Sequence, residues 1–165
     1  MHCKIIEIVA GLEKPMRKGK WARSEDLPES FTVEIADYTD DLDDEYIERL
    51  KDSFVESFGE HCVRNGSWIT FDEKAKEVDA ERRYKEFIEA AKTLSELSFD
   101  DFCGIGKSRQ DVEETVWKLT DRFEDKLGLY VYVSDEDKMV PFDAWLRRMK
   151  PGERYFMGGV MDYHW

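Results

Sequence analysis

Cysteine is scarce in this sequence, and the cysteines that are present show no pairing pattern. The three of them form an odd set without a repeated spacing, whereas small secreted domains usually carry an even number that close disulfides. The first residues lack the apolar stretch of a secretory signal peptide, and no apolar run approaches the roughly 20 residues of a membrane-spanning helix. We therefore expect a cytoplasmic protein with reduced thiols and no membrane contact.

Positive charge is also in short supply. The 25 Lys and Arg residues are outnumbered by 38 Asp and Glu residues, so the formal net charge is −13. A surface of this sign repels nucleic acids and anionic lipids, so direct nucleic-acid binding is not expected. The same charge favours a basic protein as partner, and it equally fits a surface that is simply well solvated.

Residues suited to a core, in contrast, are plentiful. Aromatic residues make up 13% of the 165 residues, which argues against disorder. This length suits one domain with a hydrophobic core of its own. No internal repeat and no low-complexity linker divides the chain. We therefore expect a single domain over residues 1–165.

Six runs of β-branched, aromatic and other apolar residues have the length and boundaries of strands. They cover residues 3–10, 31–35, 62–64, 67–71, 129–133 and 153–163. The run at 129–133 contains no charged residue, so we expect it to be buried on both faces. The Asn65-Gly66 dipeptide between two of the runs predicts a hairpin with a two-residue turn.

Four segments show the apolar spacing of helices, and they lie within residues 37–60, at 72–97, at 108–126 and after Pro141. Along the second of these helices, the residues predicted to face inward are Ala80, Tyr84, Phe87, Ile88, Ala91 and Leu94. Adjacent helices combined with a hairpin favour an α+β fold over a regular strand-helix alternation. We predict a two-layer sandwich of a mostly antiparallel, mixed sheet with helices packed on it.

The last predicted strand contains Gly158-Gly159 in its middle, which suggests a β-bulge or a close approach of another backbone segment. Alternation along a strand sends successive side chains to opposite faces. It predicts one set formed by Tyr155, Met157, Met161 and Tyr163, and a second set formed by Phe156, Val160 and His164.

The most acidic segment, residues 37–60, carries ten Asp and Glu residues against two basic residues. Part of this charge is explained by helix capping, because acids are favourable at the positive end of the helix dipole. An exposed array of carboxylates also imitates a phosphate backbone and suits the surface of a basic protein. We interpret the chain as a non-enzymatic interaction protein of the inhibitor, antitoxin or immunity, or nucleic-acid-mimic type. Its predicted partner-binding residues are Asp40, Asp41, Asp43, Asp44, Glu45, Glu48, Trp117 and Trp165.

One short loop reverses this charge. It contains five positive residues without an intervening acid, alongside a tryptophan: Lys14, Arg17, Lys18, Lys20, Trp21 and Arg23. Cations that contact phosphate and an indole that stacks on a base would suit a small nucleic-acid or other anion-binding contact. A solvated loop, or a loop that closes over the acidic helix of the same chain, fits the same residues.

The glycine-rich stretch Gly104-Ile105-Gly106-Lys107-Ser108 ends in Gly-Lys-Ser, the last three residues of the phosphate-binding-loop pattern. The first part of that pattern is absent, because Asp101 occupies the position of its first glycine and the preceding residues are acidic. We interpret this stretch as a turn between helices.

An alternative of a different class is a small metal-dependent or acid-base enzyme that uses His61, Cys103, Asp162 and His164. Asp162 and His164 are two residues apart and would share one face of a strand, where the carboxylate could orient the imidazole. Histidine and cysteine are adjacent at positions 2–3 and 61–62, so the two members of each pair would point to opposite faces. We predict no catalytic residue, metal ligand or cofactor from motifs. A third alternative is a subunit or oligomerisation domain.

Overall fold

The computed structural model describes residues 2–11, 21–106, 109–124 and 128–164. The chain divides into two compact units. Unit 1 contains residues 1–78 and 127–165 and is built around a β-sheet, whereas unit 2 contains residues 79–126 and is helical. The single-domain organisation stays a prediction, and each unit is described by itself.

The fold of unit 1 is α+β, as the sequence predicts. Its seven-stranded mixed sheet has the order β3-β4-β7-β1-β5-β6, with β2 also paired to β7. Only the β1–β5 pair is parallel among the described strands. The strands are β1 (His2–Ala10), β2 (Tyr38–Asp41), β3 (Cys62–Asn65), β4 (Trp68–Phe71), β5 (Tyr130–Val133), β6 (Lys138–Pro141) and β7 (Arg154–His164).

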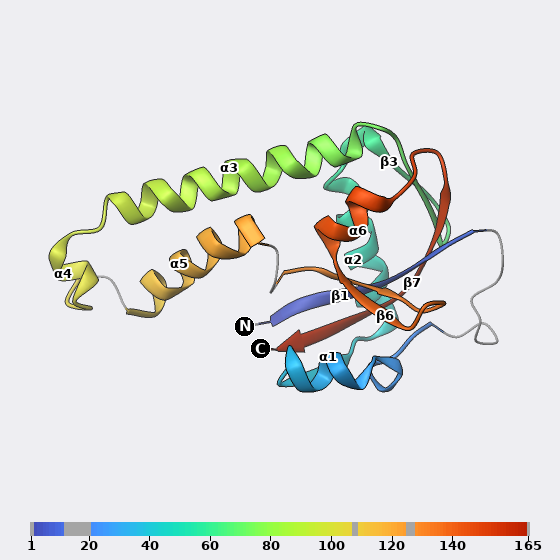
Figure 1. Cartoon of the computed structure of the whole chain (residues 1–165), viewed down its shortest axis with the longest axis horizontal. Helices are drawn as coiled ribbons and strands as arrows, with labels where there is room; N and C mark the ends of the chain where they lie inside the picture. Colours follow the sequence, from blue (N-terminus) through green and yellow to red (C-terminus); the bar gives the residue numbers. More distant parts are fainter. Residues whose placement is uncertain (1, 12–20, 107–108, 125–127, 165) are drawn as a thin grey trace. The chain divides into compact units, whose positions relative to one another are not determined.

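Strand β7 is the centre of the sheet. One edge of β7 pairs with β1 along most of its length, and the other edge pairs with β4 near its start and with β2 near its end. Figure 1 shows β1 and β7 running side by side through the middle of unit 1. The predicted strands at 3–10, 129–133 and 153–163 are confirmed, and β5 is buried on both faces except at Val133.

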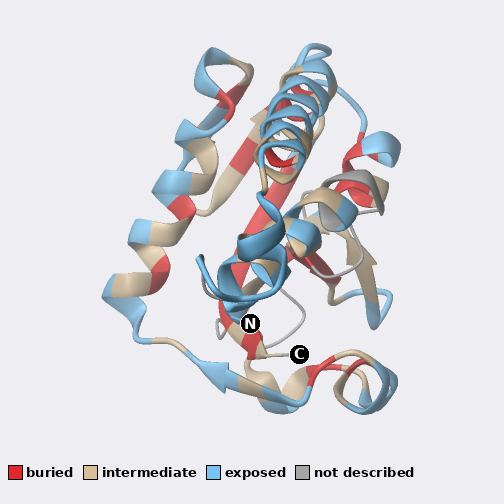
Figure 2. Cartoon of the chain, turned by 90° about the vertical axis from the view of Figure 1, so that its left-hand side faces the viewer, coloured by how far each residue is buried: buried red, intermediate tan, exposed pale blue. Residues whose placement is uncertain are grey.

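Helices cover both faces of the sheet. The helices α2 (Asp44–Glu56) and α6 (Phe142–Arg148) pack on one face, and α1 (Glu29–Glu34) packs on the opposite face (Figure 1). Short 3₁₀ helices, η1 (Ser24–Asp26) and η2 (Gly59–His61), precede α1 and β3. Figure 2 shows that the buried residues concentrate on the strands, whereas β2 is largely exposed. Full burial of each large apolar side chain stabilises the fold by about 1.5–3 kcal/mol.

The predicted bulge at Gly158-Gly159 is confirmed by the register of β1 and β7. Ile6 pairs with Val160 and Ile8 pairs with Met157, so both glycines lie opposite Glu7. The extra residue reverses the alternation along β7, and the predicted face assignment is therefore wrong. The residues Tyr155, Met157 and Val160 belong to the core under α2 and α6, whereas Met161 and Tyr163 belong to the core under α1.

The bulge accommodates a buried carboxylate. Glu7 is buried and accepts hydrogen bonds from the Ala22 amide (2.8 Å), the Gly159 amide (3.0 Å) and the Ser134 hydroxyl (2.6 Å). A Cβ atom on Gly158 would overlap this carboxylate, and a Cβ atom on Gly159 would overlap the carbonyl of Ala22. Both glycines are therefore required by close approach and not by turn geometry.

The predicted strand at 31–35 is wrong, because this segment forms α1. Pro28 occupies the N-cap position with a ψ of 136°, so the chain is still extended there and the helix begins at the next residue. Phe31 is buried, and its ring centre lies 5.1 Å from that of Tyr130 and 5.4 Å from that of Tyr163. Val33, in contrast, is 74% exposed. The apolar alternation of this segment therefore reflects one buried anchor and not the face of a strand.

The hairpin is confirmed, but its turn is shifted by one residue. Asn65 pairs with Trp68, so the two turn residues are Gly66 and Ser67. Gly66 has a φ of 61°, which suits glycine at the first position of a hairpin turn. The helix predicted at 72–97 is confirmed as α3 (Ala75–Ser95), and the side chain of Asp72 accepts from the Lys74 amide just ahead of it.

Unit 2 contains the rest of α3, the single-turn α4 (Phe99–Phe102) and α5 (Arg109–Glu124). The inward face predicted for α3 is correct only in part: Phe87, Ala91 and Leu94 are half-buried, whereas Ala80, Tyr84 and Ile88 are exposed, and Ala90 is buried as well. Between α4 and α5, a Cβ atom on Gly106 would overlap the carboxylate of Asp101. An acid in this position is unfavourable for a phosphate, which agrees with the interpretation as a turn. Lys107 and Ser108 lie outside the described residues.

Candidate protein-binding surface

The acidic segment folds as an edge strand followed by a helix. β2 is held by backbone pairing with the last residues of β7, from Tyr38 opposite His164 to Asp41 opposite Met161. Asp43 caps α2, and its carboxylate accepts from the Tyr46 amide at 2.8 Å. The first turn of α2 then contains Asp44 and Glu45, where negative charge is favourable to the helix dipole.

Five carboxylates on this backbone face solvent, and we call them the acidic surface. They are Asp40, Asp41, Asp43, Asp44 and Glu45. Among the described residues, Asp44 forms a loose exposed ion pair with Arg23 at 3.6 Å, while no basic side chain forms a salt bridge with the other four. Asp41 accepts from the Ser24 amide and Asp40 accepts from the Asp41 amide, which hold these two carboxylates in place.

Glu48 differs from these five carboxylates, because its charge is compensated inside the unit. It binds Lys51 at 3.0 Å and forms a second ion pair with Arg64, which also bonds Asp52. Burial raises the pKa of Glu48, but the hydrogen bonds from Arg64 and Lys51 outweigh this effect and hold the pKa below its usual value. Glu48 is therefore not part of the acidic surface.

Lys51 is 0% exposed although it belongs to the acidic helix. Its ammonium lies 3.7 Å from the centre of the Trp21 ring, in a cation–π contact. Burial lowers the pKa of Lys51, and the bond to Glu48 opposes this effect. Sequence reasoning missed this contact. The available signal was that Lys51 lies four residues after the buried Ile47, on the apolar face of the helix.

The described end of the basic loop contacts the acidic helix of the same chain. Trp21 covers Lys51, and Arg23 lies beside Asp44. These two contacts agree with the alternative in which the loop closes over its own acidic helix. The other predicted anion-binding residues, Lys14, Arg17, Lys18 and Lys20, lie outside the described residues.

The two tryptophans predicted as anchors, Trp117 and Trp165, belong to segments far from residues 40–45 in the sequence. Trp117 belongs to α5 of unit 2 and is half-buried, whereas its neighbour Val116 is exposed. Trp165 lies outside the described residues. The anchoring role of both side chains stays a prediction.

A second cluster of polar side chains lies where β1, β2 and β7 meet. The carboxylate of Asp162 bonds His2 and Lys4, each at 2.7 Å, and not His164 as predicted. His164 instead bonds Asp37 at 3.3 Å, because Asp37 directly precedes the strand that pairs with the end of β7. Burial raises the pKa of Asp162, but the bonds from Lys4 and His2 outweigh this and hold the pKa below its usual value.

The residues named for an enzyme do not form one group. His61 bonds Asp72 at 2.8 Å near the start of β7, roughly 20 Å or more from Asp162 at about 3.3 Å per strand residue. Cys103 is exposed and belongs to unit 2. Within the described ranges, no three His, Cys, Asp or Glu side chains are arranged to hold a metal ion.

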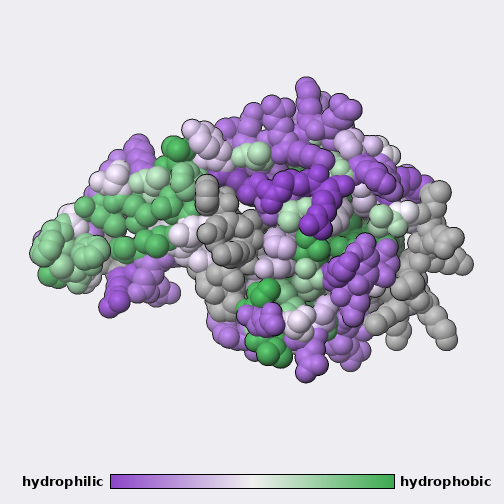
Figure 3. Space-filling view, viewed as in Figure 1, coloured by the Kyte–Doolittle hydropathy of each residue, from purple (hydrophilic) through white to green (hydrophobic). Residues whose placement is uncertain are grey.

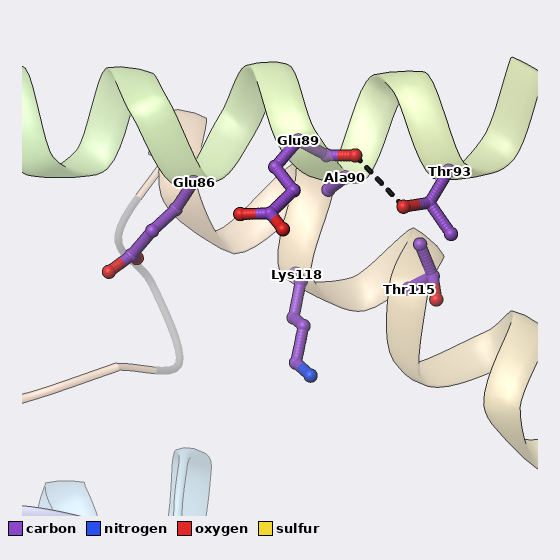
Figure 4. Close-up of a pocket in the computed structure, with 6 residues that line it drawn as sticks. All are labelled: Glu86, Glu89, Ala90, Thr93, Thr115 and Lys118. Atoms are coloured by element: carbon purple, nitrogen blue, oxygen red, sulfur yellow. Dashed lines mark hydrogen bonds between the residues drawn. The ribbon is translucent and has the colours of Figure 1, made fainter.

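The described part of the chain contains pockets away from the acidic surface. One pocket of about 390 Å³ lies beside β3, with Val63, Phe71 and Pro151 in its wall next to His61 and Asp72. Another, of about 360 Å³, lies between α3 and α5 and is lined by Glu86, Glu89, Ala90, Thr93, Thr115 and Lys118. Figure 4 shows the Thr93 hydroxyl bonded to the Glu89 carbonyl at its wall, at 3.0 Å. Neither pocket is lined by residues of the acidic surface.

Comparisons with protein families, with curated proteins and with solved structures found no match to this chain. Among the described helices, none combines the length and the apolar character that a bilayer crossing requires.

Proposed function

We propose that this chain is a non-enzymatic binding protein whose acidic surface contacts a basic protein. The observation that carries this proposal is the exposure of five carboxylates within residues 40–45, four of them without a salt bridge to any described residue. The β2 ladder and the Asp43 cap hold the backbone that carries them. A partner therefore meets a pre-arranged negative array, and little conformational entropy is lost on binding.

The physical effect of such an array lies mainly in the rate and specificity of association. A concentrated negative field raises the encounter rate with a basic partner by about 10- to 1,000-fold, and a net charge of −13 adds to this field. The interaction is sensitive to salt, because the Debye length falls from about 8 Å at 0.15 M to about 3 Å at 1 M. Proteins that bind nucleic acids carry basic surfaces of the required sign, which is why inhibitors, immunity proteins and nucleic-acid mimics are the classes that we propose.

The test compares two variants of equal net charge. In the first variant the five carboxylates are neutralised: Asp40→Asn, Asp41→Asn, Asp43→Ser, Asp44→Asn and Glu45→Gln. The serine retains a side-chain oxygen that caps α2. In the control, five other exposed acids are neutralised: Glu29→Gln, Glu34→Gln, Glu56→Gln, Glu73→Gln and Glu77→Gln.

Proteins retained from a lysate on immobilised wild-type chain are eluted with a salt gradient and identified, and the strongest binder is purified. We expect the control to keep the association rate of that binder within a few-fold. The acidic-surface variant should lose most of it. Equal binding by the two variants, or binding that is indifferent to salt, would exclude the proposal.

A second candidate function is supported by an exposed apolar face of unit 2. Phe99, Phe102 and Ile105 are 79%, 75% and 75% exposed, and Figure 3 shows apolar residues gathered around α4. Exposed aromatic groups of this kind are typical of protein interfaces. A self-associating subunit would show a concentration-dependent molar mass in light scattering, and Phe99→Ser with Phe102→Ser would restore the monomer. A wild-type monomer at high concentration would exclude this candidate.

A further inference from the structure

Two histidines face one another across the pair of central strands. His2 on β1 is the direct partner of His164 on antiparallel β7, so both side chains leave the same face of the sheet. Their ring centres are 5.3 Å apart with an angle of 67° between the ring planes. Tyr38 on β2 stacks on His164 with 5.6 Å between the ring centres, and this contact holds the plane of the imidazole. Cys3 has the opposite strand parity, so it points to the other face.

Each imidazole is oriented by a carboxylate through the same ring atom. The Nδ1 atom of His2 bonds Asp162 at 2.7 Å, and the Nδ1 atom of His164 bonds Asp37 at 3.3 Å. Since a carboxylate accepts, these bonds place a proton on Nδ1, and in the neutral ring this leaves the Nε2 lone pair available to a metal ion. A carboxylate that holds the second ring nitrogen is the usual companion of a histidine that binds a metal ion.

The spacing of the rings agrees with binding to one ion. A zinc ion lies about 2.0–2.1 Å from a histidine nitrogen, which places it about 3.2 Å from the ring centre. Two rings bound to the same tetrahedral ion therefore have centres about 5.2 Å apart. The observed 5.3 Å is close to this value, although the two rings are also in contact without an ion.

We infer that His2 and His164 form a surface site for a divalent transition-metal ion such as Zn²⁺, bound by the two Nε2 atoms and completed by water. The charges around the site favour a cation. Among the described side chains, Asp37, Asp162 and Asp40, the strand partner of Asp162, contribute three negative charges, and Lys4 beside Asp162 contributes one positive charge. With only two protein ligands, the ion exchanges freely with solvent, unlike a closed structural zinc site. The ion would tie the start of β1 to the end of β7. This inference does not depend on the proposed function.

The test is titration of the purified full chain with ZnCl₂ by isothermal calorimetry. We expect one ion per chain, and loss of that binding in both His2→Ala and His164→Ala. Asp162→Asn should weaken binding about 10- to 100-fold, because it removes the carboxylate that orients His2. Cu²⁺ should bind more tightly than Zn²⁺, as imidazole ligands generally require.

Two matched controls separate this site from other zinc ligands of the chain. His61 also bonds a carboxylate through Nδ1 but has no second histidine opposite it, so His61→Ala should leave the affinity unchanged. Cys103 is the exposed thiol, and Cys103→Ser should also leave it unchanged. Circular dichroism checks that each variant is folded. Zinc affinity that survives His2→Ala and His164→Ala, or that is lost in either control, overturns the inference.

Discussion

The buried carboxylate beneath the β-bulge gives the sharpest test of how unit 1 is held together, through the substitution Gly158→Ala. The new Cβ atom would overlap the Glu7 carboxylate, so either the strands move apart or the carboxylate leaves. Moving packed strands costs about 1–3 kcal/mol. Expelling the carboxylate leaves the buried amides of Ala22 and Gly159 unpaired, at about 1–3 kcal/mol each. Because the less costly response dominates, we expect a loss of about 2–3 kcal/mol, a large part of the usual 5–15 kcal/mol for a folded domain.

The measurement is urea denaturation of the variant and the wild type, followed by circular dichroism and tryptophan fluorescence. Gly152→Ala is the matched control, because Gly152 has a φ of 78° and no atom within 4 Å of a Cβ atom placed there. It should cost only the strain of the left-handed backbone, about 1–2 kcal/mol.

A double-mutant cycle identifies the cause of the destabilisation. In a Glu7→Ala background the obstructing carboxylate is gone, so Gly158→Ala should add less than about 1 kcal/mol to the loss already caused by Glu7→Ala. The reasoning is refuted if Gly158→Ala costs the same with and without Glu7, or if its cost in the wild type is below that of Gly152→Ala.

Three further predictions concern titratable groups. Burial lowers the pKa of Lys51 from 10.5, so between the lowered pKa of the folded state and pH 10.5 the unfolded state holds the extra proton and the free energy of unfolding should rise with pH; Lys51→Met should remove this rise in urea titrations over that pH range. The pKa of Asp162 is lowered from 3.8 despite burial, so the charged carboxylate stabilises the folded state above about pH 4. This stabilisation is lost as the pH falls through the pKa of Asp162 in the folded state, and acid denaturation of Asp162→Asn should lack this contribution. Burial raises the pKa of Cys62 to about 12, so a thiol reagent at pH 8 should label exposed Cys103 rapidly and Cys62 only after unfolding.

Much of the sheet could be predicted because several strands are bounded by strong local signals. β5 is an uncharged apolar run after Gly128, and α6 follows Pro141, so neither depends on distant residues. The segment 31–35 was mispredicted because alternation does not distinguish a strand from a short helix that buries a single phenylalanine. The Gly158-Gly159 pair predicts the bulge in β7, but the face assignment did not include the reversal that its extra residue causes. Glu7, the carboxylate that these glycines accommodate, is about 150 residues away in the chain, and no local pattern indicates it.

In the candidate sites, too, some features follow from the local sequence and others depend on residues that are distant in the chain. The exposure of the five carboxylates within residues 40–45 follows from their charge and from the cap at Asp43. The ion pairing that compensates the charge of Glu48 on α2 does not follow from the local sequence, because Arg64 reaches Glu48 from β3. The pairing of His2 with His164 requires the register between the first and last strands, which periodicity cannot supply. In unit 2, helical spacing identified the apolar stripe of α3, but it could not show which part of the stripe other residues cover.

The position of β7 at the centre of the sheet also constrains how the chain folds during translation. β1 is made first, yet the partner that contacts it along most of its length begins at residue 154. At about 5–20 residues per second, a ribosome needs roughly 8–30 s to elongate from one strand to the other. During this interval β1, β2 and the β3–β4 hairpin have no central strand to pair with. Nascent chains stalled before residue 154 should therefore bind chaperones, whereas chains released after β7 should not.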